Sequence, residues 1–370
     1  MSILDEFLFP FCVTAHSFNH DKSQVALCPN SNEVQIYGRS GTQWTLLHVL
    51  KEHDLLVTSI DWARRTNRIV TCSQDKNAYV WTLDPVANTW NPTLVHLRVN
   101  RAATQAKWSP LENKFAVASG DKCVAVCYFG EDNDWWVSKH IKKPIASTVL
   151  CVDWHPNNVL LACGSTDMKA RVFSAYIKGV DEKPAPSAWG ERLPFSTLCG
   201  EFESPSCGWV HSVAFSPDGE SVAFASHDSS VTVATPSTGE VLSVRSHYLP
   251  FTSLTWAGPQ TIVACGHDCS PMVFSKSGAE WHLSKKLGED DKSRRSATAS
   301  PSNNNSAFNL FRQMDSRNQP TKSAASSSDG SLKSVHQNTI TELHRDPSGN
   351  AAEISTSGLD GRLVLWAVQA

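Results

Sequence analysis

The adjacent residues His227, Asp228 and Ser229 carry the three side-chain types of a hydrolase triad. In a triad the imidazole must reach both the hydroxyl and the carboxylate, and three neighbours on one tight turn do not converge in this way. The sequence also lacks the short motifs of nucleophile elbows, phosphate-binding loops, dinucleotide-binding turns and zinc proteases. We therefore predict no catalytic residue, no cofactor-binding residue and no enzymatic activity.

Cysteine pairs are a second possible source of chemistry. Cys123/Cys127 and Cys265/Cys269 are each spaced C-x-x-x-C, but neither pair is joined to a second Cys or His pair at zinc-finger spacing. Most of the eleven cysteines lie inside β-like runs, which indicates buried, reduced thiols in a cytosolic protein. We predict no metal site.

Charge and hydropathy argue against two classes of partner. The net charge is −3, but residues 292–333 carry seven Lys/Arg against two Asp/Glu, so this segment holds +5 and the remainder −8. An acidic body with one basic segment is not typical of a nucleic-acid-binding protein. No apolar run approaches the roughly 18 residues of a membrane span. The N-terminus MSILDEFLFPFCV lacks a basic n-region, so we expect neither membrane insertion nor a signal peptide.

Seven stretches of the chain share one pattern, in which an apolar strand, a polar turn, a second strand, a tight turn and a third strand follow one another. They are 16–37, 60–81, 106–127, 152–173, 213–234, 254–274 and 353–366, the last of which carries only the second half of the pattern. Three successive repeats end at residues 81, 127 and 173, which are 46 residues apart, close to the roughly 40–45 residues of a WD-repeat blade. The pattern predicts an all-β, seven-bladed WD-repeat β-propeller with four strands in each blade.

Six repeats place an aspartate in the tight turn, six residues before a position that is aromatic in four of them. In WD-type repeats this aspartate, an upstream histidine and the strand aromatic form a buried hydrogen-bonded network. The predicted network residues are His53, Asp75, Trp81, Asp121, Asp167, Phe173, Asp228, His247, Asp268, Phe274, His336, Asp360 and Trp366. Only His53–Asp75–Trp81 and His336–Asp360–Trp366 are complete sets. Trp135 and Trp136 are less regular, and we expect them to pack on an outer strand.

The ring of blades must close between the two ends of the chain. The last repeat ends in LVLWAVQA and leaves no residues for a fourth strand, whereas the run at 3–11 is rich in Leu and Phe and precedes the first repeat. We predict that the strand at 3–11 closes the last blade, so that residues 1–370 form a single propeller domain.

Residues 285–335 interrupt the repeat period near the last blade. The segment is rich in Ser and Asn and poor in apolar residues, which predicts a long, mostly disordered insertion. At its centre, 307–317 has the pattern of a short amphipathic helix that would order on binding a partner. The alternative is that this segment folds back onto its own propeller. The predicted partner-binding residues are Phe308, Leu310, Phe311, Arg312 and Met314.

Five longer runs are more specific than the repeat period. They are NRIVTCSQDKNAYVWTL (67–83), EDNDWWVSKHIKKPI (131–145), VDWHPNNVLLACGSTDMKARVFSAYIK (152–178), PAPSAWG (184–190) and SCGWVHSVAFS (206–216). Together they resemble the family of WD-repeat subunits (subunit 1) of the actin-related protein 2/3 complex. The resemblance covers nearly the full chain and is weakest in 285–335.

The resemblance implies a non-catalytic subunit of a cytoplasmic, seven-protein assembly that nucleates a daughter actin filament on the side of a mother filament in cortical branched actin. The implied partners are the small scaffold subunits, an actin-related subunit, the actin filament and the acidic tails of nucleation-promoting factors. The family motif in the insertion, an aromatic residue followed three residues later by Leu or Met, matches Phe311 and Met314. No cofactor is implied.

Two other functions are compatible with a propeller. The first is another WD-repeat adaptor, such as a substrate receptor of a ubiquitin ligase, which would be expected to carry arginine-rich docking motifs on one rim. The second is a propeller enzyme, which would need carboxylates or metal ligands that converge on the central axis. The sequence shows neither feature.

Overall fold

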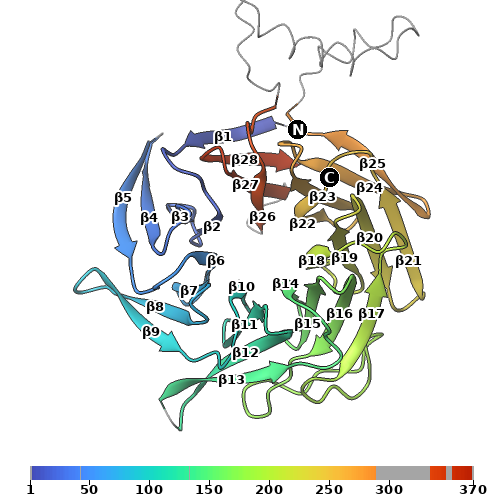
Figure 1. Ribbon diagram of the computed structural model, residues 1–370, viewed down its shortest axis with the longest axis horizontal. Helices are drawn as coiled ribbons and strands as arrows, with labels where there is room; N and C mark the ends of the chain where they lie inside the picture. The colour runs from blue at the N-terminus through green and yellow to red at the C-terminus, as the bar shows by residue number, and fades with distance from the viewer. Residues whose placement is uncertain (1, 42, 133, 289–333, 347–351, 369–370) are drawn as a thin grey trace, which may run out of the picture.

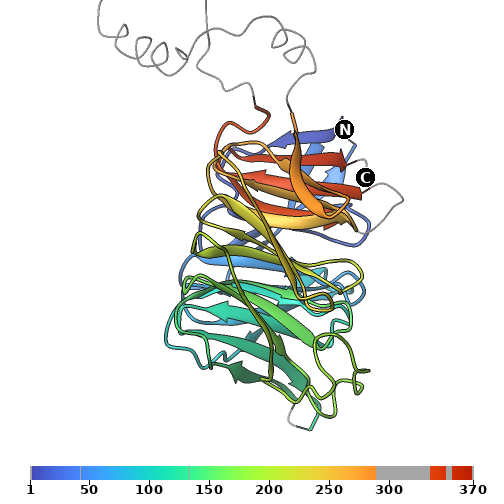
Figure 2. The same cartoon turned by 90° about the vertical axis from the view of Figure 1, so that its right-hand side faces the viewer.

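The computed structural model describes residues 2–41, 43–132, 134–288, 334–346 and 352–368, and the regular elements in these ranges are all β-strands. Seven four-stranded antiparallel sheets are arranged as blades around a central axis (Figure 1). The side view shows that together they form a flattened disc (Figure 2). The predicted all-β, seven-bladed propeller is therefore confirmed. The insertion's predicted helix at 307–317 lies outside the described residues.

Blades 1 to 3 run in chain order from the innermost to the outermost strand. Blade 1 contains β2 (Ala15–Phe18), β3 (Gln24–Cys28), β4 (Val34–Ser40) and β5 (Gln43–Leu50). Blade 2 contains β6 (Val57–Trp62), β7 (Arg68–Ser73), β8 (Ala78–Asp84) and β9 (Thr89–Val95). Blade 3 contains β10 (Ala103–Trp108), β11 (Lys114–Ser119), β12 (Cys123–Gly130) and β13 (Trp135–Ile141).

Blades 4 to 6 follow the same order. Blade 4 contains β14 (Val149–Trp154), β15 (Leu160–Ser165), β16 (Lys169–Ser174) and β17 (Leu198–Glu203). Blade 5 contains β18 (Val210–Phe215), β19 (Val222–Ser226), β20 (Ser230–Thr235) and β21 (Glu240–Arg245). Blade 6 contains β22 (Phe251–Gly258), β23 (Thr261–Gly266), β24 (Met272–Ser277) and β25 (Glu280–Lys286).

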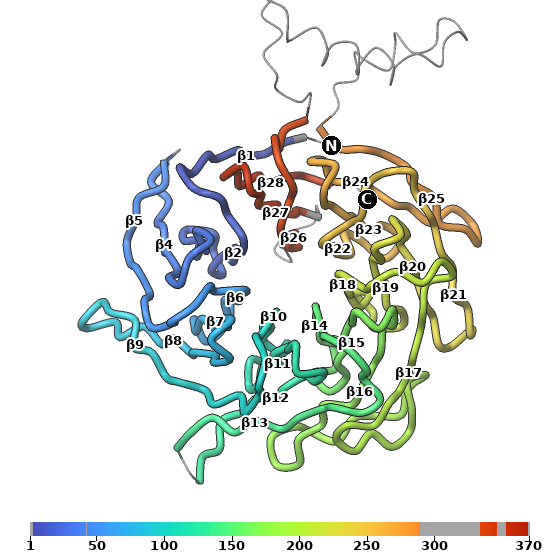
Figure 3. Tube along the Cα trace, viewed as in Figure 1, coloured from blue at the N-terminus to red at the C-terminus, as the bar shows by residue number. Residues whose placement is uncertain are grey.

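Blade 7 combines strands from both ends of the chain. Its order from the axis outward is β26 (Ile340–Asp346), β27 (Ala352–Gly358), β28 (Arg362–Val368) and β1 (Ser2–Leu8). Strand β1 pairs antiparallel with β28 from Ser2↔Ala367 to Leu8↔Arg362, so the first and last strands of the chain lie side by side in this blade (Figure 3). The outer strand of the ring's last blade thus comes from the N-terminus.

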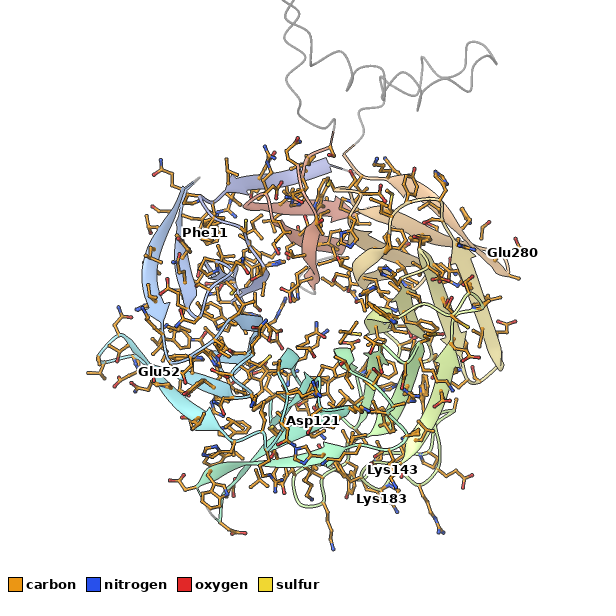
Figure 4. All side chains as sticks on the ribbon, in the orientation of Figure 1. Phe11, Glu52, Asp121, Lys143, Lys183 and Glu280 are labelled. Carbon is orange, nitrogen blue, oxygen red and sulfur yellow. The ribbon has the colours of Figure 1, made fainter. Side chains whose placement is uncertain are left out.

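The blades are held together by apolar side chains that fill the spaces between neighbouring sheets (Figure 4). The second strand of a blade is covered on both faces by neighbouring blades, so β11, β15 and β23 are buried along their whole length. Apart from the buried Lys114 at the start of β11, they have continuous runs of small and apolar residues instead of an alternating pattern. Outermost strands such as β21 keep exposed residues throughout.

A second set of contacts joins the blades near the axis. In each of the seven junctions, a side chain on the innermost strand of one blade accepts the backbone N–H of a residue on the innermost strand of the next. The pairs are Ser17 with Trp62 (3.0 Å), Asp61 with Trp108 (2.7 Å), Gln105 with Val152 (2.8 Å), Asp153 with Phe215 (2.7 Å), Ser212 with Leu254 (3.1 Å), Ser253 with Leu343 (3.1 Å) and Glu342 with His16 (2.8 Å). These bonds form a closed ring, which satisfies backbone donors that no sheet ladder reaches.

The long connection between β16 and β17 is ordered by buried polar contacts. The ammonium group of Lys114 donates to the carboxylate of Asp181 and to the carbonyl of Ala175, and the side chains of Lys114 and Asp181 are 0% and 2% exposed. Further along, Trp189 is 4% exposed, and its Nε1 donates to the carbonyl of Gly219 at 2.9 Å. The connection is therefore fastened to blades 3 and 5.

Candidate interaction surfaces

The predicted network of blade 2 is present, and a threonine joins it. His53 Nδ1 lies 2.7 Å from Asp75 Oδ2, His53 Nε2 lies 2.9 Å from Thr71 Oγ1, and Trp81 Nε1 donates to the same hydroxyl at 2.9 Å. An ionised carboxylate can only accept hydrogen bonds. The direction of donation is therefore the same at each step: Trp81 donates to Thr71, Thr71 donates to His53, and His53 donates to Asp75. Burial lowers the pKa of His53, and the hydrogen bond with Asp75 opposes this shift.

Blade 7 repeats the same network at the other end of the chain. His336 Nδ1 lies 3.1 Å from Asp360 Oδ1, its Nε2 lies 2.8 Å from Thr356 Oγ1, and Trp366 Nε1 donates to that hydroxyl at 2.9 Å. Burial acts to raise the pKa of Asp360, but the hydrogen bonds from His336 and from the N–H of Gln337 outweigh it and lower the pKa to about 2. This carboxylate is therefore ionised at neutral pH.

The two threonines are the network members that the sequence pattern missed. Thr71 and Thr356 each lie four residues before the turn aspartate, at Asp75 and Asp360, so a spacing signal was available. Threonine is a common strand residue, however. Nothing else in the sequence of the second strand indicates that one hydroxyl joins the tryptophan to the histidine, a link that we call the threonine relay.

The other predicted aspartates occupy the same turn but bind different partners. Asp121 accepts a hydrogen bond from the N–H of Asn100, and Asp268 accepts one from the N–H of Leu249. Asp167 binds the N–H of Ala146 and the guanidinium of Arg171. Asp228 accepts hydrogen bonds from the hydroxyls of Ser204 and Ser230. The aromatic residues Phe173 and Phe274 are fully buried. His247 is exposed and stacks on Tyr248 at 4.3 Å, while Asp268 binds Leu249 instead. The histidine of this repeat therefore lies apart from its aspartate.

The residues that first suggested enzymatic chemistry are placed for structural roles. His227 Nδ1 lies 2.8 Å from His211 Nε2, whereas the carboxylate of Asp228 binds serines on its own turn and the preceding loop. His227, Asp228 and Ser229 thus do not form a triad. Burial raises the pKa of the Cys123 thiol to about 11 and raises those of Cys127 and Cys265 as well, which keeps these thiols protonated and poor as metal ligands.

The base of the insertion is anchored on the ring. On one side Leu287, which is 2% exposed, donates its N–H to the carbonyl of Pro271 at 2.8 Å. On the other side Val335 packs on the cluster between blades 6 and 7, and the next residue is the fully buried His336 of the blade 7 network. The predicted partner-binding residues Phe308, Leu310, Phe311, Arg312 and Met314 lie outside the described residues.

The outer rim between blades 2 and 3 carries an apolar groove of about 260 Å³. It is lined by Leu94, His96 and Arg98 of blade 2 and its following loop and by the start of β13, including Trp135. Trp136 packs against Trp108 and Phe115, as expected, but Trp135 is 62% exposed. Successive residues of a strand point to opposite faces, so only one of the two tryptophans can reach the core.

No helix of the described residues is long and apolar enough to cross a membrane.

The chain is similar to a repeat family and, over nearly its full length, to several named proteins. A family model described as WD domain, G-beta repeat matches residues 44–82, 138–174 and 196–233. A protein of Xenopus laevis named actin-related protein 2/3 complex subunit 1A-B is 48% identical over 360 residues, which cover 96% of this chain and 93% of the relative. The Schizosaccharomyces pombe actin-related protein 2/3 complex subunit 1 is 45% identical, with 95% of both chains covered. An Arabidopsis thaliana subunit 1B is 40% identical, with 99% of this chain and 97% of the relative covered.

Proposed function

Because this chain belongs to the subunit 1 family of the actin-related protein 2/3 complex, we propose that it is a non-catalytic interaction subunit that supports the nucleation of branched actin filaments. The proposed partners are the small scaffold subunits, an actin-related subunit, the actin filament and the acidic tails of nucleation-promoting factors. The proposed location is the cytoplasmic, cortical network of branched actin.

The observation that carries this proposal is the anchored base of the insertion. Leu287 and His336 are both buried, and the second is held by the Asp360–Thr356–Trp366 network of blade 7. Both ends of the segment 289–333 thus start from a rigid ring. A tethered ligand on a rigid base has a raised effective concentration at a partner that the ring already contacts.

We propose that 307–317 binds actin as an amphipathic helix in a groove. Phe311 and Met314 would be its anchors, with Phe308 and Leu310 beside them. Burying an apolar side chain of this size contributes about 1.5–3 kcal/mol, from which the cost of ordering the segment must be subtracted. The excess of basic residues in 292–333 would steer the segment towards an acidic surface.

Two measurements test the proposal at different levels. Affinity purification of the tagged full chain should recover actin-related subunits, and recovery without them would refute membership of the complex. Within the purified complex, Phe311→Ala with Met314→Ala should leave assembly intact and lower branch density in a fluorescence branching assay. The matched control is Asn309→Ala with Ser316→Ala on the opposite face of the helix. Equal branch density in the two double variants would refute the role of the helix but not that of the propeller.

A further inference from the structure

The junction between the last and first blades brings together two histidines and a glutamate that lie far apart in the sequence. His16 lies on β2 of blade 1, and Glu342 and His344 lie on β26 of blade 7. Their ligand atoms all lie within 4.8 Å of one another. His16 Nδ1 is 3.8 Å and His344 Nε2 is 3.2 Å from the same oxygen, Glu342 Oε2, and the two imidazole rings are perpendicular.

This donor set and spacing suit one transition-metal ion. Two imidazoles and one carboxylate form the ligand set of many zinc sites with three protein ligands and one open position. In tetrahedral geometry, with bonds of about 2.0–2.1 Å, ligand atoms are about 3.4 Å apart. The separations of 3.8 Å and 3.2 Å from Glu342 Oε2 therefore need to change by only a few tenths of an ångström. The two histidine nitrogens, which lie within 4.8 Å of each other, need to approach by at most about 1.4 Å. We propose that His16 Nδ1, Glu342 Oε2 and His344 Nε2 bind a single Zn²⁺ ion across this junction.

The surroundings of His16 support the assignment. The side chain of His16 is fully buried and is held between two serines of β27, Ser355 and Ser357. Its other nitrogen, Nε2, lies 2.8 Å from Ser355 Oγ, which provides the outer partner that metal-bound histidines usually have. Ser357 Oγ, 2.9 Å from Nδ1, also lies 3.2 Å from Thr341 Oγ1 and can bond there when a metal takes its place.

The carboxylate is oriented and the site is accessible. Glu342 Oε2 accepts the backbone N–H of His16 at 2.8 Å, which fixes the carboxylate against the first blade. Glu342 and His344 line a cavity of about 40 Å³ near the axis, and His344 also lines a neighbouring cavity of about 60 Å³. An ion would therefore reach Glu342 and His344 from the axis of the ring, with the buried His16 behind them.

The consequence is a cross-link between the two ends of the chain. His16 follows the N-terminal strand of blade 7, and Glu342 and His344 follow the insertion, so an ion would join two blades that the backbone connects only through β1. Bound Zn²⁺ should accordingly raise the temperature at which the full chain unfolds.

The experiment uses the full chain with Cys12→Ser and Cys207→Ser, because these two thiols are exposed and would bind zinc themselves. After removal of metal with a chelator, Zn²⁺ is titrated by calorimetry in excess Mg²⁺, and Co²⁺ is titrated by visible absorption. We expect one equivalent of Zn²⁺ with a micromolar or tighter Kd, tetrahedral Co²⁺ bands, and a higher Tm with Zn²⁺.

Three variants separate this site from adventitious binding. His344→Gln removes one ligand, and Glu342→Gln removes the charge but keeps an oxygen for the N–H of His16, so each should weaken Zn²⁺ binding by more than about 100-fold, beyond the 10–100-fold typical of outer-partner changes. The control His282→Gln, on the exposed side of β25, should leave the affinity unchanged. Absence of a one-equivalent site, or equal affinity in His344→Gln and His282→Gln, would overturn the proposal.

Discussion

The threonine relay of blade 7 allows a test in which one hydroxyl is removed without changing shape. Thr356→Val is nearly isosteric, and it removes the group that accepts from Trp366 Nε1 and donates to His336 Nε2. The chain offers a matched control in Thr71→Val, because Thr71 makes the same two bonds in blade 2 at distances equal within 0.1 Å. The two variants differ only in which part of the ring they affect.

The expected magnitude follows from the two groups left behind. Trp366 and His336 are buried at 2% and 0% exposure, so neither the indole N–H nor the imidazole nitrogen can turn to water. Leaving a buried polar group unsatisfied costs about 1–3 kcal/mol, so each variant should lose about 2–6 kcal/mol of unfolding free energy. The two losses should be similar because the two networks are chemically the same.

Guanidinium unfolding of the full chain, followed by tryptophan fluorescence, measures the loss through the shift in midpoint. Branch density of the reconstituted complex provides the second readout, and here the variants should differ. Thr356→Val loosens His336 at the base of the insertion, whereas Thr71→Val does not. Unchanged stability in both variants would refute the relay, and an equal effect of both on branching would refute the anchoring role of blade 7.

Two further predictions concern buried charges. The pKa of Asp360 is lowered to about 2 in the folded chain, so its contribution to stability is complete above its unfolded pKa of about 3.9 and is lost as pH falls from there towards 2. Asp360→Asn should remove this part of the loss of stability in acid, so the Tm of the variant should fall less between about pH 6 and pH 3 than the Tm of the unmodified chain. The lower pH is chosen because it lies about one unit below the unfolded pKa. Lys114→Met removes the positive charge beside the buried Asp181, which keeps the N–H of Ile177 and the amide of Asn158 as donors, and should cost about 3–5 kcal/mol. Lys114→Met with Asp181→Leu should recover part of this loss, and an equal or larger loss in the double variant would contradict the account.

Most of the fold could be predicted because it is repeated. A turn aspartate six residues before a strand aromatic, as in Asp75–Trp81 and Asp360–Trp366, locates the tight turn and the third strand together. The buried second strands then follow from their apolar runs. The repeat could not indicate the exact strand at the N-terminus: the predicted run at 3–11 corresponds to β1 (Ser2–Leu8), after which Phe9 donates to Gly361 as part of a loop.

The contacts near the axis could not be predicted in the same way. Their acceptors are Ser17, Asp61, Gln105, Asp153, Ser212, Ser253 and Glu342. Each junction requires only a side-chain oxygen within hydrogen-bond distance of a backbone N–H in the next blade. Ser, Asp, Gln and Glu all meet this condition, so the seven positions share no residue type that a sequence pattern could reveal. The closeness of His16 to Glu342 and His344 is hidden for a related reason, since these residues meet only after the ring has closed.

The position of the insertion next to the closing blade has a mechanical consequence. The segment 289–333 joins β25 of blade 6 to β26 of blade 7, so a force applied through it acts across one junction of the ring. Blade 7 cannot separate from blade 6 without breaking the bond between Ser253 and the N–H of Leu343, or from blade 1 without breaking the bond between Glu342 and the N–H of His16. It also cannot release β28 without breaking the ladder to β1. A propeller that binds a partner through this segment therefore resists opening at the blade where a ring built from one chain would otherwise be weakest.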